Sequence, residues 1–210
     1  MGGISPDGKW VNIRPGTSPQ KEVLIPTGPG EEIDINLPGI GSATVVYWLP
    51  DGKSYIVSGN VAGKNDIYWY WQPSSGTLRP LSHEIENARP SALRPDGTEL
   101  VMRWDEGYRS IALPSGDAKP FPGLEDADRA LVWSADGKAI YFLPPSQEPP
   151  NTFSVWRLDL ATRRRSLWKQ ITPSKSVDHV GGLHLTPNGC CYAYSYERTL
   201  SDLYLADGLR

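Results

Sequence analysis

Short runs in which apolar and polar residues alternate recur along this chain, and turn-forming residues bound each run. One of them, LPDGKSYIVSG at 49–59, begins at a Pro-Asp-Gly turn and continues into residues that favour strands. Alternation with a period of two predicts a β-strand with one face turned inward. No stretch shows a helical period long enough to compete, so the pattern predicts an all-β chain.

The same turn and strand return five times and align without gaps. The aligned stretches are ISPDGKWVNI (4–13), WLPDGKSYIV (48–57), LRPDGTELVM (93–102), WSADGKAIYF (133–142) and LTPNGCCYAY (185–194). The turn pairs are Asp7 and Gly8, Asp51 and Gly52, Asp96 and Gly97, Asp136 and Gly137, and Asn188 and Gly189. Successive copies are 44, 45, 40 and 52 residues apart, which indicates one structural unit repeated along the chain.

The chemistry of the repeated turn is local. Proline presets φ for the first turn position, Asp or Asn bonds its own backbone two residues on, and Gly takes the positive φ that closes the hairpin. Side chains that recur once per unit are spread around the fold, whereas a metal site needs several oxygens at one point. We therefore assign these ten residues a structural role in turns, and predict neither a metal nor a cofactor.

Each turn leads into a strand with apolar residues four and six positions after the turn Asp or Asn. These residues are Val11 and Ile13, Tyr55 and Val57, Leu100 and Met102, Ile140 and Phe142, and Tyr192 and Tyr194. A second β-prone run follows, and after most copies a short fourth run. Four antiparallel strands in about 40–45 residues are typical of one β-propeller blade. The sequence thus predicts one domain, 1–210, with repeats at roughly 1–40, 41–86, 87–126, 127–178 and 179–210.

The turns SPDGK, LPDGK, RPDGT and SADGK resemble the TolB-like propeller repeat, a relative of the WD-type repeat. Residues 177–210 further resemble the C-terminal end of bacterial serine/threonine protein kinases of the acidobacterial receptor type, which carry such a propeller after the kinase domain. The Cys190-Cys191 pair departs from the pattern, which usually has Lys after the turn Gly. The resemblance implies a sensory or docking domain for a protein or small ligand. We expect no enzyme activity, because the chain lacks a kinase's Gly-rich loop, HRD and DFG motifs.

The ends of the repeat predict an incomplete ring. The first copy has barely a first strand before its turn, and the last copy ends after its third strand. Propellers commonly complete the last blade with a strand from the N-terminus, and the sequence shows none. We therefore expect an open arc of about five repeats with an exposed edge, which favours edge-to-edge self-association.

Charge and composition narrow the range of partners. The net charge of −3 and the pI of about 5.6 do not fit a nucleic-acid partner, which needs a concentrated basic face. No run of 18 apolar residues is present, so we expect no membrane contact from this chain itself. The first ten residues lack the regions of a signal peptide. We expect a periplasmic location if a membrane-anchored parent carries the domain, and a cytoplasmic one otherwise.

Two tryptophans are the candidate binding residues. Alignment of NDIYWYWQ (65–72) with SVWRLDL sets Trp69 against Arg157 and Trp71 against Asp159. Aromatic residues at positions that another copy fills with charge indicate a contact surface, and packing against the neighbouring blade is the alternative. The basic run 163–165 is expected to be a solvated turn, with docking of an acidic partner as its alternative.

Two other functions remain open. One is a TolB-like periplasmic protein that docks to an envelope partner. The other is the propeller half of a serine peptidase of the prolyl-oligopeptidase type, which would need an α/β-hydrolase domain after it. The chain ends as if at a natural C-terminus, which disfavours the peptidase. This chain also lacks a GxSxG motif, and its segment SHEIEN at 82–87 lacks the second His of a HExxH zinc site.

Overall fold

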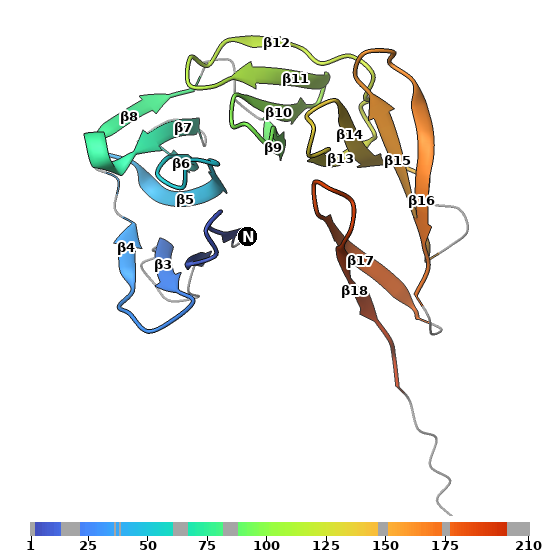
Figure 1. Ribbon diagram of the computed structural model, residues 1–210, viewed down its shortest axis with the longest axis horizontal. Coiled ribbons are helices and arrows are strands. Elements are labelled where there is room, and N and C mark those ends of the chain that lie inside the picture. Colours follow the sequence, from blue (N-terminus) through green and yellow to red (C-terminus); the bar gives the residue numbers. More distant parts are fainter. Residues whose placement is uncertain are drawn as a thin grey trace, which may run out of the picture.

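Five antiparallel β-sheets stand side by side around a common axis in the computed structural model (Figure 1). The structure describes residues 3–13, 22–35, 37, 39–60, 67–81, 88–146, 151–173 and 177–200. Four sheets have four strands each, and the fifth has two. The predicted all-β propeller is confirmed. Within the described residues, no helix is long and apolar enough to cross a membrane.

Strands follow one another in sequence order within each sheet, so each sheet is one blade. Blade 1 contains β1 (Gly3–Ile4), β2 (Trp10–Ile13), β3 (Glu22–Pro26) and β4 (Ile33–Ile35). Blade 2 contains β5 (Gly41–Trp48), β6 (Tyr55–Asn60), β7 (Ile67–Gln72), the short 3₁₀ helix η1 (Pro73–Ser75) and β8 (Thr77–Pro80). Blade 3 contains β9 (Arg89–Leu93), β10 (Glu99–Trp104), β11 (Gly107–Ala112) and β12 (Ala118–Pro120). Blade 4 contains β13 (Arg129–Trp133), β14 (Ala139–Leu143), β15 (Phe153–Asp159) and β16 (Arg165–Ile171), and blade 5 contains β17 (His179–Leu185) and β18 (Tyr192–Glu197).

The blades form an arc rather than a closed ring. The first strand of a blade lies nearest the axis and the fourth lies outermost, as β9 and β12 show in Figure 1. The arc is open between blade 1 and blade 5 (Figure 1), which confirms the predicted incomplete ring. The third strand expected in the last repeat falls within residues 201–208, outside the described part of the chain.

The hydrophobic core is divided into four layers, one at each boundary between neighbouring blades. The boundary of blades 1 and 2 buries Leu24, Ile35, Leu37, Tyr55 and Val57. The boundary of blades 2 and 3 buries Leu49, Ile56, Leu81, Ala88, Leu100, Met102 and Ile111. The boundary of blades 3 and 4 buries Ala92, Val101, Tyr108, Phe121, Leu124, Ala130, Trp133, Ile140, Phe142 and Leu158. The boundary of blades 4 and 5 buries Tyr141, Leu143, Phe153, Val155, Ile171 and Leu183.

This layering corrects the expectation that each second strand turns only one face inward. In blades 2 to 4 both faces of the second strand are buried, because each face lies against a different neighbour; Ile56, Val101 and Tyr141 alternate with the predicted apolar positions and are also buried. In blade 5 the pattern is present but its face is less covered, and Tyr192 is 40% exposed. Burial of this pattern therefore depends on having a blade on each side.

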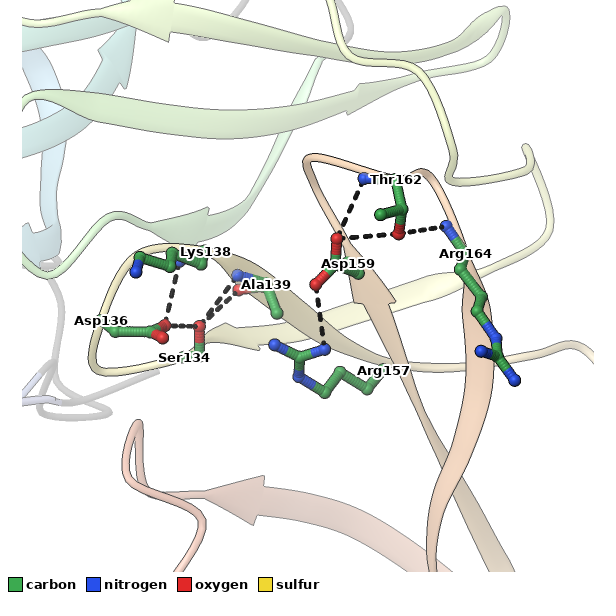
Figure 2. Close-up of polar contacts among 8 residues, drawn as sticks. All are labelled: Ser134, Asp136, Lys138, Ala139, Arg157, Asp159, Thr162 and Arg164. Atoms are coloured by element: carbon green, nitrogen blue, oxygen red, sulfur yellow. Dashed lines mark hydrogen bonds and ion pairs between the residues drawn. The ribbon is translucent and has the colours of Figure 1, made fainter.

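The repeated turn closes each first hairpin in the same way. Its glycine has a φ between 64° and 74° in all five copies, and its N–H donates to the carbonyl three residues back. The turn carboxylate or amide accepts the N–H two residues on, as Asp136 does from Lys138 at 3.0 Å (Figure 2). In the same turn Ser134 donates its hydroxyl to Asp136 at 2.6 Å.

A hydroxyl reaches the turn Asp or Asn in every copy, although it comes from different positions. In blades 1, 4 and 5 the hydroxyl belongs to the residue two positions before the turn Asp or Asn. These residues are Ser5, Ser134 and Thr186. Where that position holds an apolar or basic residue, the hydroxyl comes from after the turn instead, from Ser54 or Thr98. The sequence alignment did not reveal this shared hydrogen bond, because the residue that carries the hydroxyl stands before the turn in three copies and after it in two.

Turns of neighbouring blades also touch one another. A Cβ placed on Gly97 in blade 3 would lie 2.7 Å from Cδ of Pro50, the proline of blade 2's turn. A Cβ on Gly137 in blade 4 would lie 3.2 Å from Nε of Arg94 in blade 3. The turn glycines therefore provide room for the adjacent blade as well as the positive φ.

A second joint between blades comes from tyrosines on the third strand. The Tyr68 hydroxyl donates to the Ala88 carbonyl at 3.1 Å, and the Tyr108 hydroxyl donates to the Asp128 carbonyl at 2.6 Å. In both cases the acceptor lies 20 residues later, on the connection that enters the next blade. Each tyrosine thus fixes the start of the following blade.

Two glycine variants separate the two roles of the turn. Gly52→Ala places a Cβ in open space and meets only the positive φ of 64°, so we expect a loss of about 1 kcal/mol in unfolding free energy. Gly97→Ala has a similar φ of 74° and also meets the Pro50 ring, so we expect a further loss of about 1–3 kcal/mol. Urea unfolding of the two variants measures the difference. Equal losses would show that the contact between turns contributes nothing.

The turn carboxylates make stability depend on pH in the acid range. The Ser134 hydroxyl and the Lys138 N–H lower the pKa of Asp136 in the folded chain. A carboxyl whose folded pKa is depressed stabilises the fold above its unfolded pKa of about 3.9, and that contribution is lost as pH falls through the folded value. Asp136→Asn keeps the turn, as Asn188 does in blade 5, but does not titrate. We expect urea midpoints to fall less for this variant than for the wild type between about pH 6 and about pH 3; parallel falls would contradict the assignment.

Candidate functional site

A pocket of about 370 Å³ lies at the boundary of blades 4 and 5. Its lining comes from the inner strands of both blades and from the loop that joins the second and third strands of blade 4. The lining residues are Ala127, Arg129, Leu143, Pro144, Pro145, Asn151, Thr152, Phe153, His179 and Val180. Apolar and polar groups both contribute to this surface, with the apolar share the larger, and a concave surface of this kind is a candidate small-ligand site.

Two basic side chains line this pocket because of their position in the propeller. Arg129 is the first residue of β13, and His179 is the first residue of β17. These inner strands are neighbours, so their first residues lie on the same face of the arc. Arg89 begins β9, the inner strand on the other side of β13. All three side chains are exposed, and Arg129 and His179 form no ion pair with any described residue.

The wall opposite these strands is held in place by polar contacts. Asn151 has a left-handed φ of 56°, and its Nδ2 donates to the Val177 carbonyl at 2.9 Å. Thr152 is buried, and its hydroxyl lies 3.0 Å from that of Thr172. Both contacts tie the loop of blade 4 to the connection that enters blade 5. Asn151 and Thr152 are therefore held in position at this side of the pocket.

The described lining residues offer more groups for binding than for covalent or acid–base chemistry. They include no Ser, Cys, Asp, Glu or Lys, the Thr152 hydroxyl is already paired, and His179 is the one side chain among them suited to proton transfer. In the described part of the chain, no group of three or more His, Cys, Asp or Glu residues is arranged to hold a metal ion. The turn residues Asp7, Asp51, Asp96, Asp136 and Asn188 belong to five different blades and do not enter the pocket.

In the basic run 163–165, Arg163 and Arg164 are exposed in a turn, as the sequence predicted, whereas Arg165 begins β16 and is half-buried. Arg165 forms ion pairs with Asp128, at 2.9 Å, and with Glu125, and its guanidinium lies 4.6 Å from the centre of the Phe142 ring. Arg163 donates to the Pro122 carbonyl at 3.0 Å. Both side chains thus fasten the connection between blades 3 and 4. Burial raises the pKa of Asp128, although the Glu125 N–H and Arg165 partly offset this.

The candidate binding residues Trp69 and Trp71 lie at the boundary of blades 1 and 2. Both are half-buried and pack against the layer formed there. The Tyr55 and Trp71 ring centres are 5.0 Å apart. The Trp69 indole N–H is buried and has no hydrogen-bond partner among the described residues. These contacts place both side chains in the packing between blades; a role in binding a partner stays a prediction.

Strand pairing also corrects the alignment on which that prediction depended. Trp69 pairs with Val57 and Trp71 with Tyr55, whereas in blade 4 the corresponding positions of β14 pair with Trp156 and Leu158. The alignment with Arg157 and Asp159 was therefore one residue out of register. A shift of one residue moves a side chain to the other face of a strand, which is why Trp69 and Trp71 were compared with the ion pair of Arg157 and Asp159 on the opposite face.

Replacing Trp71 measures how much this packing contributes. Trp71→Ala removes a half-buried ring from the boundary layer, so we expect a loss of about 3 kcal/mol in unfolding free energy. Leu167→Ala is the control, because Leu167 lies on a strand and is 49% exposed; we expect a change within about 0.5 kcal/mol. Chemical unfolding measures both. An unchanged stability for Trp71→Ala would favour a binding surface instead.

The comparisons with known proteins found similar structures but no matching family. No protein family matches this sequence, and no curated protein matches it. TolB from Acinetobacter baumannii is similar with a TM-score of 0.61 and 21% identity, over 90% of this chain and 46% of that one. Putative TolB from Agrobacterium tumefaciens gives 0.66 and 19%, over 96% of this chain and 71% of that one. A prolyl endopeptidase structure gives 0.50 and 19%, over 83% of this chain and 27% of that one.

These likenesses concern the fold alone, since every identity is below 25%. This chain spans less than half the length of the Acinetobacter structure. Its repeats are arranged as blades in the same way as in two TolB structures, and the chain is an open β-propeller with a TolB-like fold.

Proposed function

We propose that this chain is a non-catalytic binding domain whose ligand occupies the pocket between blades 4 and 5. The observation that carries the proposal is that Arg129 and His179 both line this pocket, beside apolar residues. A ligand with an apolar body and a carboxylate fits this combination best. A peptide terminus or an acylated amino acid has that chemistry.

The apolar part of the lining supplies affinity, and the basic residues supply selectivity. Leu143, Phe153 and Val180 offer surface that a hydrocarbon or aromatic body can cover. An Arg guanidinium binds a carboxylate through two parallel hydrogen bonds. None of the described residues that line the pocket is acidic, so none of them competes for Arg129. A cation that has no partner in the described chain is available for an anion.

The parent protein is a further part of the proposal. The resemblance of residues 177–210 to the end of receptor-type serine/threonine kinases supports a sensory domain attached to such a kinase. On that basis the domain lies outside the cytoplasmic membrane and transmits ligand occupancy to the kinase. The likeness to two TolB structures supports the alternative of a periplasmic protein that docks to an envelope partner. The likeness to a prolyl endopeptidase supports, as a third reading, the propeller of a peptidase.

Binding of N-acetylated amino acids tests the pocket directly. We expect N-acetyl-phenylalanine and N-acetyl-leucine to bind in NMR titrations with shifts confined to the pocket, and their carboxamides to bind more weakly. Arg129→Gln removes the carboxylate partner, so we expect an affinity loss of about tenfold, equivalent to about 1.4 kcal/mol. Arg89→Gln is the matched control, since Arg89 also begins an inner strand but lies outside the pocket, and we expect no change.

Three results would contradict the proposal. Equal binding of acid and carboxamide would show that Arg129 does not select the ligand. Equal losses in the two Arg variants would indicate a general charge effect instead of a site. Shifts confined to Trp69 and Trp71 would move the binding surface to the boundary of blades 1 and 2.

A further inference from the structure

Two adjacent cysteines stand at the turn of blade 5 with their sulfurs in contact. Cys190 and Cys191 are both exposed free thiols, and their Sγ atoms are 3.1 Å apart. Neighbouring residues within a strand point to opposite faces. Here Cys190 still belongs to the turn, because its N–H donates to Asn188 Oδ1 at 3.1 Å, and β18 begins only at Tyr192. The turn therefore brings together two sulfurs that a regular strand would separate.

The two thiols differ in acidity. The hydrogen bond between them lowers the pKa of Cys190 and raises that of Cys191. The thiolate is the reactive form of cysteine. One sulfur is thus the better nucleophile, and the other retains its proton beside it.

No other copy of the repeat has this pair. The two residues after the turn glycine are Lys9 and Trp10, Lys53 and Ser54, Thr98 and Glu99, and Lys138 and Ala139 in the first four copies. These residues complete the hairpin equally well, so the turn itself does not require sulfur. The dithiol is specific to blade 5.

We propose that Cys190 and Cys191 form a reversible redox site, which hydrogen peroxide oxidises to a disulfide between the adjacent residues. The Cys190 thiolate attacks the peroxide, the O–O bond breaks, and a sulfenic acid forms while the leaving oxygen takes a proton and departs as water. The Cys191 sulfur then attacks the sulfenic sulfur, the S–O bond breaks, and a second water leaves with the Cys191 proton. The two thiols lose two electrons in total, and one hydrogen peroxide gains them.

A disulfide between adjacent residues is easily reduced. Consecutive Cα atoms are about 3.8 Å apart across a trans peptide, whereas disulfides usually join Cα atoms about 4.4–6.8 Å apart. The bond therefore forms with strain in the connecting backbone. Strained and exposed disulfides are the labile ones, in contrast to structural bridges. The site thus suits a switch and not a permanent cross-link.

Oxidation acts on the joint between blades 4 and 5. The Thr186 N–H donates to the Cys191 carbonyl at 3.0 Å, and the Cys191 N–H donates to the Thr186 hydroxyl at 3.1 Å. The same turn contacts blade 4, because the Ala135 N–H donates to the Pro187 carbonyl at 2.8 Å. Strain in the 190–191 peptide weakens the bonds at Cys191 and loosens this turn on its neighbour.

Mass spectrometry after peroxide treatment and alkylation tests the disulfide. We expect the peptide that carries both cysteines to lose about 2 Da and to take up no iodoacetamide, and dithiothreitol or excess glutathione to restore two alkylated thiols. Cys190→Ser and Cys191→Ser remove one partner each, so neither shows the 2 Da loss. Two alkylatable thiols after treatment, or sulfinic acid or intermolecular dimers in the wild type, would overturn the proposal.

Hydrogen exchange measures the effect on the joint. We expect amides of residues 186–191, and the Ala135 N–H that donates to the Pro187 carbonyl, to exchange faster in the oxidised wild type, and those of the equivalent turn at 49–54 in blade 2 to stay unchanged. Peroxide should change neither segment in a Cys190→Ser, Cys191→Ser double variant. Equal exchange at 186–191 before and after disulfide formation would overturn the proposed loosening, whereas the mass measurement decides the disulfide independently.

Discussion

Packing between neighbouring sheets is the interaction on which this fold depends. No blade has a core of its own, because each buried layer takes side chains from two blades. A small twisted sheet cannot bury both of its faces without partners, and the inner blades gain one partner on each side. Phe142 and Tyr141, adjacent on β14, illustrate this arrangement, since they belong to the layers on opposite sides of blade 4.

The recurrent turn also acts between blades. Its carboxylate or amide and its glycine close a hairpin, and the lack of a side chain on Gly97 lets the Pro50 ring approach. Two tryptophans three residues before the turn reach the preceding blade, since Trp48 donates to Asn12 and Trp133 donates to the Ala92 carbonyl. The motif thus joins neighbouring blades as well as neighbouring strands.

The sequence predicts the repeat well because turn chemistry and period-two alternation are local. The hairpins and the blade length follow from them, and the incomplete first and last copies predict the open arc. Contacts between repeats join residues far apart in the sequence, and local sequence patterns did not predict them. Arg165 looks like part of a solvated basic run, but it meets Asp128 from an earlier segment. The pocket was not predicted either, since Arg129 and His179 share no motif. Their position at the start of consecutive inner strands was the signal that could have found them.

The layers between blades make the arc a one-dimensional array in thermodynamic terms. Each blade is coupled to its nearest neighbours and to little else, so free energy is distributed over boundaries and not over the domain as a whole. A terminal blade in such an array has one coupling where an inner blade has two. Blade 5, with Tyr196 53% exposed, is at that end of the array. Within the described arc, loss of order is therefore easiest at the outer blades, and the boundary of blades 3 and 4 has the largest buried layer.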